Sequence, residues 1–367
     1  MGFGQEAMKI RRRRSRAVSV GGVRMGGGAP VSVQSMTNTP TSDARATIAQ
    51  IAALADAGAQ IVRVSVPDEA SAAALHSIVA GSRVPIVADI HFRHDLALAA
   101  VDAGVSKLRI NPGNIRRPAD VRAVAGKAAS RGIPIRIGIN SGSIPGDIRE
   151  RFGTGADALW AAAERHLRIL DEAGFTDTVI SLKASDPMTT VEANLRAARE
   201  CDRPLHLGVT EAGPRLEGAV RSSVAMSLLL ARGIGDTIRV SLSGPPEDEP
   251  FVAWEILSSL GLGSIHPRLV SCPTCARTRI DVAGLAEQVS GILRGMRGSF
   301  TVAVMGCEVN GPGEARDADL AVIGSPAGVI LFEGGRRLPG TVRPGEVRSR
   351  LSEELERLAR EHGGPVS

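Results

Sequence analysis

Three of the four cysteines in this chain occur in two short motifs, and thiolates are soft ligands that favour soft metals. Cys272 and Cys275 are separated by two residues, so one tight turn presents both thiolates, and Cys307 follows further along the chain. Such thiolates select zinc or an iron–sulfur cluster over hard cations. The spacing therefore predicts a metal or cluster site with three cysteine ligands.

The fourth ligand has to be another residue, because Cys201 lies far upstream and has no paired spacing. We expect Cys201 to be a buried residue at a helix end. Glu314 is the nearby carboxylate, and the turn-forming run at 310–313 allows the chain to fold back and bring it beside Cys307. A carboxylate oxygen is a weak, exchangeable ligand of iron. We therefore predict a cluster with one labile corner, where a substrate replaces Glu314.

Length and composition set the scale of the fold. A chain of 367 residues suits a barrel of about 250 residues plus a smaller domain. Hydrophobic residues make up 43% and aromatic residues 2%, so the core has to be packed by aliphatic side chains. Four cysteines without even spacing favour a reducing compartment, so we expect a cytoplasmic location. No apolar run approaches the roughly 20 residues of a membrane span, and we expect no membrane contact.

The chain begins with a basic cluster at 9–16, which contributes to the net charge of +5. No interleaved aromatic residues or nucleic-acid motif accompany it, so we expect a solvated cluster that does not bind nucleic acid. A glycine-rich stretch at 21–28 follows, without the strand-to-helix context of a dinucleotide site. We treat residues 1–30 as a separate N-terminal segment with no phosphate role.

Eight short β-branched runs alternate with alanine-rich helical stretches from residue 31 onward. Eight strand–helix alternations are typical of a TIM (β/α)8 barrel. We therefore expect an α/β fold with a substrate-binding barrel over 31–262. The strands are expected at 31–36, 61–66, 85–90, 107–112, 134–140, 179–185, 205–210 and 238–243, and helices at 42–57, 156–173, 218–232 and 250–260.

A smaller α+β domain is expected over 263–367, and it contains both cysteine motifs. The predicted elements are a helix at 281–295, strand-like runs at 300–305, 320–323 and 329–332, and a terminal helix from 344.

Every second residue in each predicted barrel strand is polar, and we call these positions the polar phase of the strand. Parallel strands are usually apolar at all positions. Arg109 and Asn111, for example, alternate with Leu108 and Ile110. Because side chains alternate across a strand, the apolar phase faces the helices and the polar phase lines the barrel. The polar phase comprises Gln34, Arg63, Ser65, Asp89, His91, Arg109, Asn111, Arg136, Asn140, Lys183, Ser185, His206, Thr210, Arg239 and Ser241.

Five of these inward side chains are cationic. Cations that converge in one lumen repel one another unless carboxylates or a polyanionic ligand offset their charge. Asp89 and Glu211 are too few to do so. The excess favours a phosphate-rich substrate over an internal ion-pair network, because the planar fork of arginine binds phosphate oxygens bidentately. The five are Arg63, Arg109, Arg136, Lys183 and Arg239.

Seven phrases along the chain occur together in one enzyme family. They are VQSMTNT at 33–39, VRVSVP at 62–67, ADIHF at 88–92, LRINPGN at 108–114, GVTEAG at 208–213, CPTC at 272–275 and NGPGE at 310–314. In this order they resemble the bacterial 4-hydroxy-3-methylbut-2-enyl diphosphate synthases, from about residue 10 to about residue 350. Ala276 stands where the family pattern has glycine or serine, and we expect no effect on ligation.

The resemblance implies an oxidoreductase of the methylerythritol phosphate route to isoprenoids. Members of the family open the ring of 2-C-methyl-D-erythritol 2,4-cyclodiphosphate by two-electron reduction with loss of water, giving 4-hydroxy-3-methylbut-2-enyl diphosphate. They use a [4Fe-4S] cluster that receives electrons from flavodoxin or ferredoxin. A cationic barrel mouth and a displaceable Glu314 both fit this activity.

The same resemblance assigns roles to particular residues. Cys272, Cys275, Cys307 and Glu314 are the implied cluster ligands. Glu211, at the end of the seventh strand, is placed to deliver a proton, and a helix-capping or ion-pairing role is the alternative. The implied substrate contacts are Arg63, Arg109, Arg136, Asn140, Lys183, His206, Arg239 and Ser241.

We also expect a homodimer in which the cluster domain of one chain closes over the barrel of the other. The active face of a TIM barrel lies at the C-terminal ends of its strands, and the last helix leads the chain toward the opposite face. The connection at 261–267 spans at most about 25 Å, so its own barrel mouth is difficult to reach. A two-fold pairing gives two equivalent closed sites.

Two other classes of function remain open. In the first, the cysteines and Glu314 bind structural zinc, and the arginines at 11–14 contact nucleic acid. In the second, the chain is a non-redox barrel enzyme such as a pterin-type synthase, and the cysteine domain only supports the barrel. Colourless protein with zinc would favour the first class, and activity without iron would favour the second.

Overall fold

The computed structural model describes residues 10–111, 114–115 and 117–362. The chain divides into two compact units, Met1–Gly263 and Ser264–Ser367. Lys9 of the basic cluster and residues 112–113 of the LRINPGN phrase lie outside the described residues. No helix in these described ranges combines the length and apolar character needed to cross a membrane.

The first unit is a parallel barrel, which confirms the predicted fold. Its strands follow the order β8-β7-β6-β5-β4-β3-β10-β9. A parallel bridge between Ile180 and Leu205 joins β8 to β9 and closes the circle. The strands are β3 (Ser32–Met36), β4 (Ile61–Ser65), β5 (Ile86–Asp89), β6 (Lys107–Ile110), β7 (Ile135–Asn140), β8 (Thr178–Lys183), β9 (His206–Leu207) and β10 (Thr237–Ile238).

The last two strands are shorter than predicted, and the backbone segments that follow them approach each other closely. A Cβ on Gly208 would lie 2.5 Å from the Arg239 carbonyl oxygen and 2.6 Å from Lys183 Nζ. Only glycine leaves this space for the inward lysine. Hydrogen bonding still continues beyond β10, where the Arg239 amide donates to the Leu207 carbonyl over 3.0 Å.

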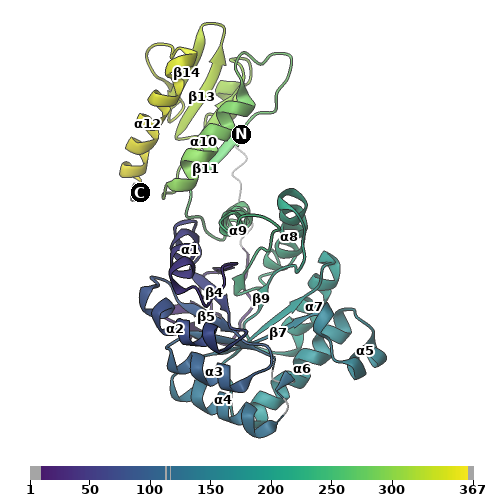
Figure 1. Ribbon diagram of the computed structural model, residues 1–367. Helices are drawn as coiled ribbons and strands as arrows, with labels where there is room; N and C mark the ends of the chain where they lie inside the picture. Colours follow the sequence, from purple (N-terminus) through teal and green to yellow (C-terminus); the bar gives the residue numbers. More distant parts are fainter. Residues whose placement is uncertain (1–9, 112–113, 116, 363–367) are drawn as a thin grey trace. The chain divides into compact units, whose positions relative to one another are not determined.

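Helices surround the barrel strands (Figure 1) and bury their apolar faces against the outward phase of the sheet. Several begin at an aspartate whose carboxylate accepts a backbone N–H, as Asp43 accepts from Ala46 and Asp186 from Thr189. The helices are α1 (Ala44–Asp56), α2 (Glu69–Gly81), α3 (His94–Asp102), α4 (Pro118–Ser130), α5 (Gly146–Phe152), α6 (Ala156–Glu172), α7 (Pro187–Glu200), α8 (Arg215–Leu230) and α9 (Asp248–Ser259).

The segment before the barrel is part of the first unit, and the expectation of a solvated basic cluster is wrong for two of its arginines. Arg12 and Arg13 lie 3.4 and 3.8 Å from the buried carboxylate of Asp236. A hairpin of β1 (Val18–Val20) and β2 (Val23–Met25) turns at Gly21 and Gly22, the start of the glycine-rich stretch. Apolar hairpin residues pack against inward residues at the starts of the barrel strands, including Ile61. The hairpin therefore covers one end of the barrel.

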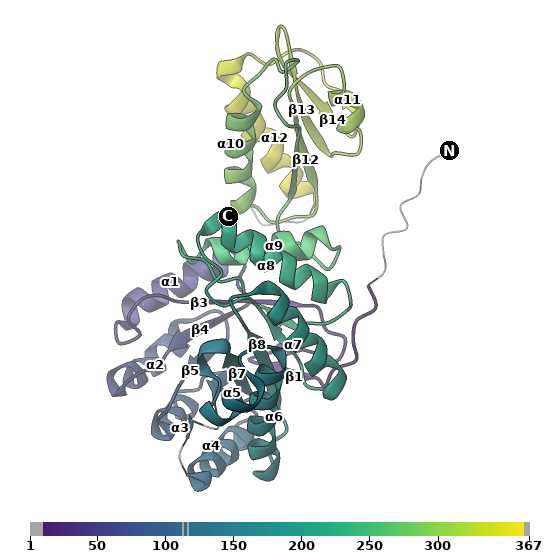
Figure 2. The ribbon, with the colours of Figure 1, turned by 90° about the vertical axis from the view of Figure 1, so that its right-hand side faces the viewer.

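The second unit is an α+β domain with the sheet order β11-β12-β13-β14-β15. Three neighbouring strands run parallel, β11 (Arg268–Ser271), β12 (Thr301–Met305) and β13 (Leu320–Ser325). β14 (Gly328–Glu333) pairs antiparallel with both β13 and β15 (Arg336–Arg337). In Figure 2, α10 (Val282–Gly295) and α12 (Val347–Glu361) lie on one face and the short α11 (Gly311–Glu314) on the other. The terminal helix predicted from 344 starts as a 3-10 turn, η3 (Pro344–Glu346).

Candidate functional site

The barrel encloses a polar cavity of about 210 Å³ at the carboxyl ends of its strands. Its lining side chains come from seven of the eight strands or the segments that follow them, so barrel closure alone brings them together. The lining residues are Arg63, Asp89, His91, Arg109, Arg136, Gly138, Asn140, Ser181, Lys183, Thr210, Arg239 and Ser241.

Seven of the eight predicted substrate contacts line this cavity: Arg63, Arg109, Arg136, Asn140, Lys183, Arg239 and Ser241. The eighth, His206, is fully buried elsewhere in the barrel interior, and its ring nitrogens have no hydrogen-bond partner among the described residues. Burial, with Arg136 and Lys183 nearby, lowers the pKa of His206 well below its ordinary value. His206 is therefore a neutral side chain.

Glu211 is exposed and directly follows Thr210, which lines the cavity. Its φ of 54° is the only positive value for a non-glycine residue in the described part of the chain. Such a conformation costs energy and occurs preferentially at functional sites. The backbone at the end of this strand is therefore strained at the position where the sequence predicts a proton donor.

Asp89 is a buried carboxylate with several cationic neighbours. Its oxygens lie 3.1 Å from Arg109, 3.6 Å from Arg63 and 3.8 Å from His91. Burial alone would raise the pKa of Asp89, but Arg63 and Arg109 overcome this effect and hold that pKa at about 2. Burial lowers the pKa of Arg63 to about 10. Asp89 thus remains charged and orients these two arginines.

Glu249 is a second buried carboxylate, which the sequence analysis did not identify. It lies near the start of α9, with 4% of its surface exposed, and accepts two hydrogen bonds of 3.2 and 3.1 Å from the guanidinium of Arg239. Ser35 Oγ and the Leu242 amide also donate to it. Glu249 therefore fixes the orientation of Arg239 at the cavity wall.

Lys107 is a further inward cation, also missed in the sequence. It is fully buried, and its ammonium group donates to Gln34 Oε1 over 3.3 Å. The strand alternation could have revealed it, because it shares the phase of Arg109. Burial, with a contribution from Arg136, lowers the pKa of Lys107 well below its ordinary value.

The described barrel interior therefore carries more cations than its two buried carboxylates can pair. Arg136 has only 1% of its surface exposed, and neither its Nε nor its Nη1 has a hydrogen-bond partner in the described structure. Burial first, and then the neighbouring cations, push the pKa values of Arg136 and Lys183 well below their ordinary values. A polyanion in the cavity would relieve this cost, because each phosphate oxygen supplies a charged acceptor.

The second unit has its own cavity, of about 170 Å³, which brings together all four predicted cluster ligands. It is lined by Cys272, Pro273, Cys275, Arg277, Met305, Gly306, Cys307, Asn310, Gly311 and Glu314.

Two neighbouring parallel strands position these ligands. Cys272 directly follows β11, and Cys307 follows β12 after one glycine. Parallel strands end at the same edge of a sheet, so the two thiols meet there. The Gly306 amide donates to Cys272 Sγ over 3.1 Å, and a Cβ on Gly306 would lie 2.9 Å from Val282. Glycine therefore allows the loop to approach the cysteine closely.

The donor set fits an iron–sulfur cluster, because three thiols and one carboxylate line one cavity and thiolates are the ligands that such clusters use. Within the described residues, no three His, Cys, Asp or Glu side chains are gathered closely enough to bind one metal ion. Backbone amides of Val309 and Asn310, with Arg277, lower the pKa of Cys307 and favour its thiolate.

All four cysteines are free thiols, and Cys201 belongs to the first unit whereas the other three belong to the second. It is the C-terminal cap of α7, is half-buried, and its Sγ donates to the Ala197 carbonyl. Burial raises the pKa of its thiol, so it is predominantly protonated at neutral pH. Cys201 thus lies at a helix end as predicted, but it is half-buried rather than buried.

Two family models match the chain. The GcpE TIM-barrel domain matches residues 15–254, and the GcpE protein C-terminal domain matches residues 268–357. Curated relatives named 4-hydroxy-3-methylbut-2-en-1-yl diphosphate synthase (flavodoxin) match nearly the whole chain. The relative from Natranaerobius thermophilus is 51% identical and covers 89% of this chain and 92% of its own length. The relative from Salinispora tropica is 50% identical and covers 97% of this chain and 91% of its own length.

Solved structures resemble the chain only distantly. Dihydropteroate synthase from Xanthomonas albilineans is 18% identical, with a TM-score of 0.47, and the match covers 67% of this chain and 99% of that one. 3-Dehydroquinate dehydratase from Geobacillus kaustophilus is 16% identical, with a TM-score of 0.49, and the match covers 68% of this chain and 98% of that one. Likeness at this level carries no argument about function.

The depressed pKa of Asp89 predicts a specific acid dependence of stability. Because the folded-state pKa of about 2 lies below the ordinary 3.8, the stabilisation is present above pH 4 and is lost as the pH falls toward 2. Between pH 5 and pH 3, wild type should lose about 1 kcal/mol more unfolding free energy than Asp89→Asn, measured by urea titration.

The matched control is Asp202→Asn, since this carboxylate pairs with Arg16 but is 58% exposed. An exposed pair contributes little, so this variant should follow the acid dependence of wild type. Equal acid losses in wild type and Asp89→Asn would refute the charged, arginine-paired state of Asp89.

Proposed function

The chain belongs to the GcpE family, and we propose that this enzyme converts 2-C-methyl-D-erythritol 2,4-cyclodiphosphate to 4-hydroxy-3-methylbut-2-enyl diphosphate. The reaction consumes two electrons and two protons, opens the ring at a carbon–oxygen bond, and releases water. The product serves isoprenoid biosynthesis. The observation that carries the proposal is the cationic barrel cavity, together with three cysteines and a glutamate lining a second cavity.

In the barrel, the arginines would hold the diphosphate of the substrate. Arg63 and Arg109 are oriented by Asp89, and Arg239 by Glu249, so their guanidinium groups are fixed before the ligand arrives. Arg136 and Lys183 have no such carboxylate within ion-pair distance among the described residues, which leaves their charge available to phosphate oxygens. Asn140 and Ser241 would complete the binding by hydrogen bonds. His206, buried away from the cavity lining, would act by supporting the residues around it.

In the second unit, we assign Cys272, Cys275, Cys307 and Glu314 as ligands of a [4Fe-4S] cluster. When bound, this group supplies electrons one at a time to a substrate carbon that loses its oxygen. The carboxylate of Glu314 is the weakest of the four ligands, so it is the one that a substrate oxygen would replace. Glu211, held in a strained conformation beside the barrel cavity, would deliver a proton to the departing oxygen.

The electrons would come from flavodoxin, the donor printed in the names of the curated relatives, or from ferredoxin. A cytoplasmic location fits four free thiols, because a reducing compartment keeps them reduced. We propose no nucleic-acid partner, since Arg12 and Arg13 are occupied by contacts within the chain.

The working unit would be a homodimer in which the cluster domain of one chain serves the barrel of the other. An exposed apolar stripe on α8 supports association of two chains. Leu216, Val220 and Val224 recur every fourth residue on one helix face and are 73%, 55% and 45% exposed. Such contiguous exposed apolar side chains mark interaction sites.

Anaerobically isolated protein should be brown and contain about four irons and four sulfides per chain. It should convert the cyclic diphosphate when reduced flavodoxin is supplied.

Glu314→Ala should retain its fold, measured by circular dichroism, and part of its iron, because three thiolates still anchor the cluster. Its iron content and its turnover should nevertheless be lower than those of wild type, the turnover much lower. Glu314→Cys should retain more iron but turn over slowly, because thiolate is harder to displace.

One zinc per chain without acid-labile sulfide would instead identify a structural metal domain, and turnover in iron-free protein would identify a non-redox enzyme. Unchanged turnover in both Glu314 variants would remove this residue from the site.

Mixing two inactive variants tests the shared site. Arg109→Ala damages only the barrel and Cys307→Ser only the cluster domain, so random exchange of subunits makes half of the dimers mixed. Each mixed dimer with trans sites has one undamaged pair, and roughly a quarter of wild-type activity should return. If activity stays at the level of the parents after exchange, verified by mass spectrometry of tagged chains, the sites lie within single chains.

A further inference from the structure

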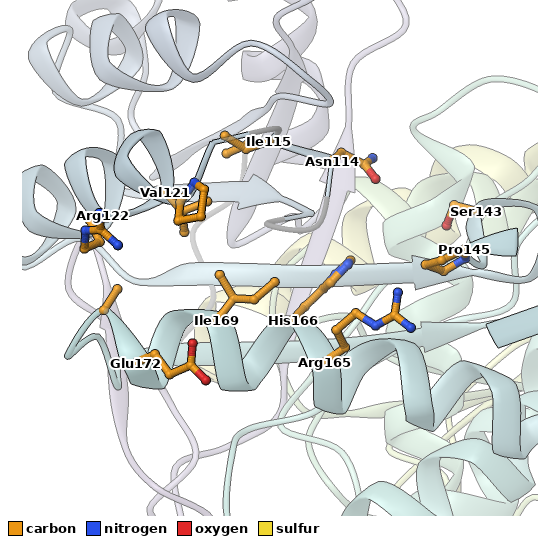
Figure 3. A pocket seen from close by; sticks show the side chains of 12 residues that line it. Asn114, Ile115, Val121, Arg122, Ser143, Pro145, Arg165, His166, Ile169 and Glu172 are labelled. Atoms are coloured by element: carbon orange, nitrogen blue, oxygen red, sulfur yellow. The ribbon is translucent and has the colours of Figure 1, made fainter. Parts of the chain in front are cut away.

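A third cavity, of about 420 Å³, lies on the flank of the barrel between α4 and α6 (Figure 3). Its lining residues differ from those of the barrel cavity. Its volume falls within the range of about 300–1,000 Å³ that is typical of small-molecule sites. The cavity lining includes Asn114, Ile115, Val121, Ser143, Arg165, His166 and Ile169.

His166 is an unusual residue in this wall. It is only 2% exposed, and neither ring nitrogen has a hydrogen-bond partner in the described structure. In Figure 3 its ring points from α6 into the cavity, toward the side that carries Asn114 and Ile115. Burial lowers the pKa of His166 to about 4, so its imidazole is neutral at pH 7. Leaving such a group unpaired is costly, and a ligand that hydrogen-bonds to it would recover that cost.

The cavity has polar and apolar parts. Asn114 and Arg165 add N–H donors, and Ser143 adds a hydroxyl oxygen, on the side where the ring of His166 lies. Arg165 is held there by Asp147, whose Oδ1 lies 3.1 Å from its Nη1. Apolar surface comes from α4 and α6, where Val121 is buried and Ile169 half-buried. This pattern suits a ligand with an anionic oxygen-rich head and a short hydrocarbon tail.

We propose that this flank cavity is a second ligand site, for a small molecule that joins a phosphate or diphosphate head to a short branched hydrocarbon tail. The donors around His166 would hold the head, and Ile115, Val121 and Ile169 would cover the tail. That such molecules are also products of the chain's own chemistry rests on the proposed function.

The flank site is connected to the barrel cavity through the ends of two strands. Ser143 Oγ accepts from the Asn140 amide and donates to the Asn140 carbonyl, each over 3.0 Å, and Asn140 lines the barrel cavity. The Asn114 amide donates to the Asn111 carbonyl over 2.8 Å, and Asn111 Oδ1 accepts from the Gly138 amide. A ligand that displaces Ser143 or Asn114 would therefore change the position of groups that bind substrate. The flank site is thus placed to regulate substrate binding.

Calorimetry on the full-length cluster-loaded protein tests this with three probes: 3-methylbutyl diphosphate, pyrophosphate and 3-methylbutan-1-ol. The saturated diphosphate should bind two sites per chain, and Arg109→Ala should remove only the barrel site. At the remaining site, pyrophosphate and the alcohol should each bind at least tenfold more weakly than the joined molecule, because each fills only part of the cavity.

Variants of His166 should affect only the flank site. In the Arg109→Ala background, His166→Leu should weaken the remaining binding about tenfold or more, and His166→Gln should restore part of it by hydrogen bonding. His76→Leu, an exposed histidine on α2, is the matched control and should bind as its parent does. No binding in Arg109→Ala, or equal binding with and without His166→Leu, would overturn the proposal. Neither result would bear on the barrel site, because that site is measured as the binding seen in wild type and lost in Arg109→Ala.

Discussion

The burial of excess positive charge inside a barrel is the constraint on which this structure depends. Parallel barrels are normally filled by apolar layers, but here the inward phase carries arginine and lysine around a small cavity. Two carboxylates, Asp89 and Glu249, orient part of this set, and they leave Arg136 and Lys183 without a carboxylate partner in the described interior. Such an arrangement costs stability in the empty protein, and it makes sense when a diphosphate completes the charge balance.

Both candidate sites use the same property of parallel strands. Strands that run in one direction end at one edge, so the residues that follow them meet without any long-range contact being specified separately. In the barrel this rule gathers cations from β4, β6, β7 and β8. In the second unit it joins Cys272, after β11, to Cys307, after β12. Glycines then open the space, as Gly208 does for Lys183 and Gly306 does for the cysteine loop.

Much of the barrel could be predicted, because alternation in a strand depends only on local sequence. The inward position of Arg109 followed from this rule, and Lys107 was within its reach. The role of Glu249 could not be predicted from this rule, because a glutamate near a helix start is ordinary on a surface. Only closure of the barrel brings it to Arg239. His206 shows the limit of the rule, because phase alone does not say how deep an inward residue lies. Arg12 and Arg13, in the segment before the barrel, likewise pair with Asp236, which is distant in sequence.

The most direct test of the account is the stability of Arg136→Met with and without the cyclic diphosphate. Methionine keeps much of the volume and removes a buried charge, so the variant without ligand should be more stable than wild type by about 1 kcal/mol or more in urea unfolding. Wild type should gain about 2.7 kcal/mol at a ligand concentration of 100 times Kd, whereas the variant should gain almost nothing. A variant that is less stable without ligand, and is still stabilised by it as wild type is, would show that Arg136 serves the fold and would contradict the account.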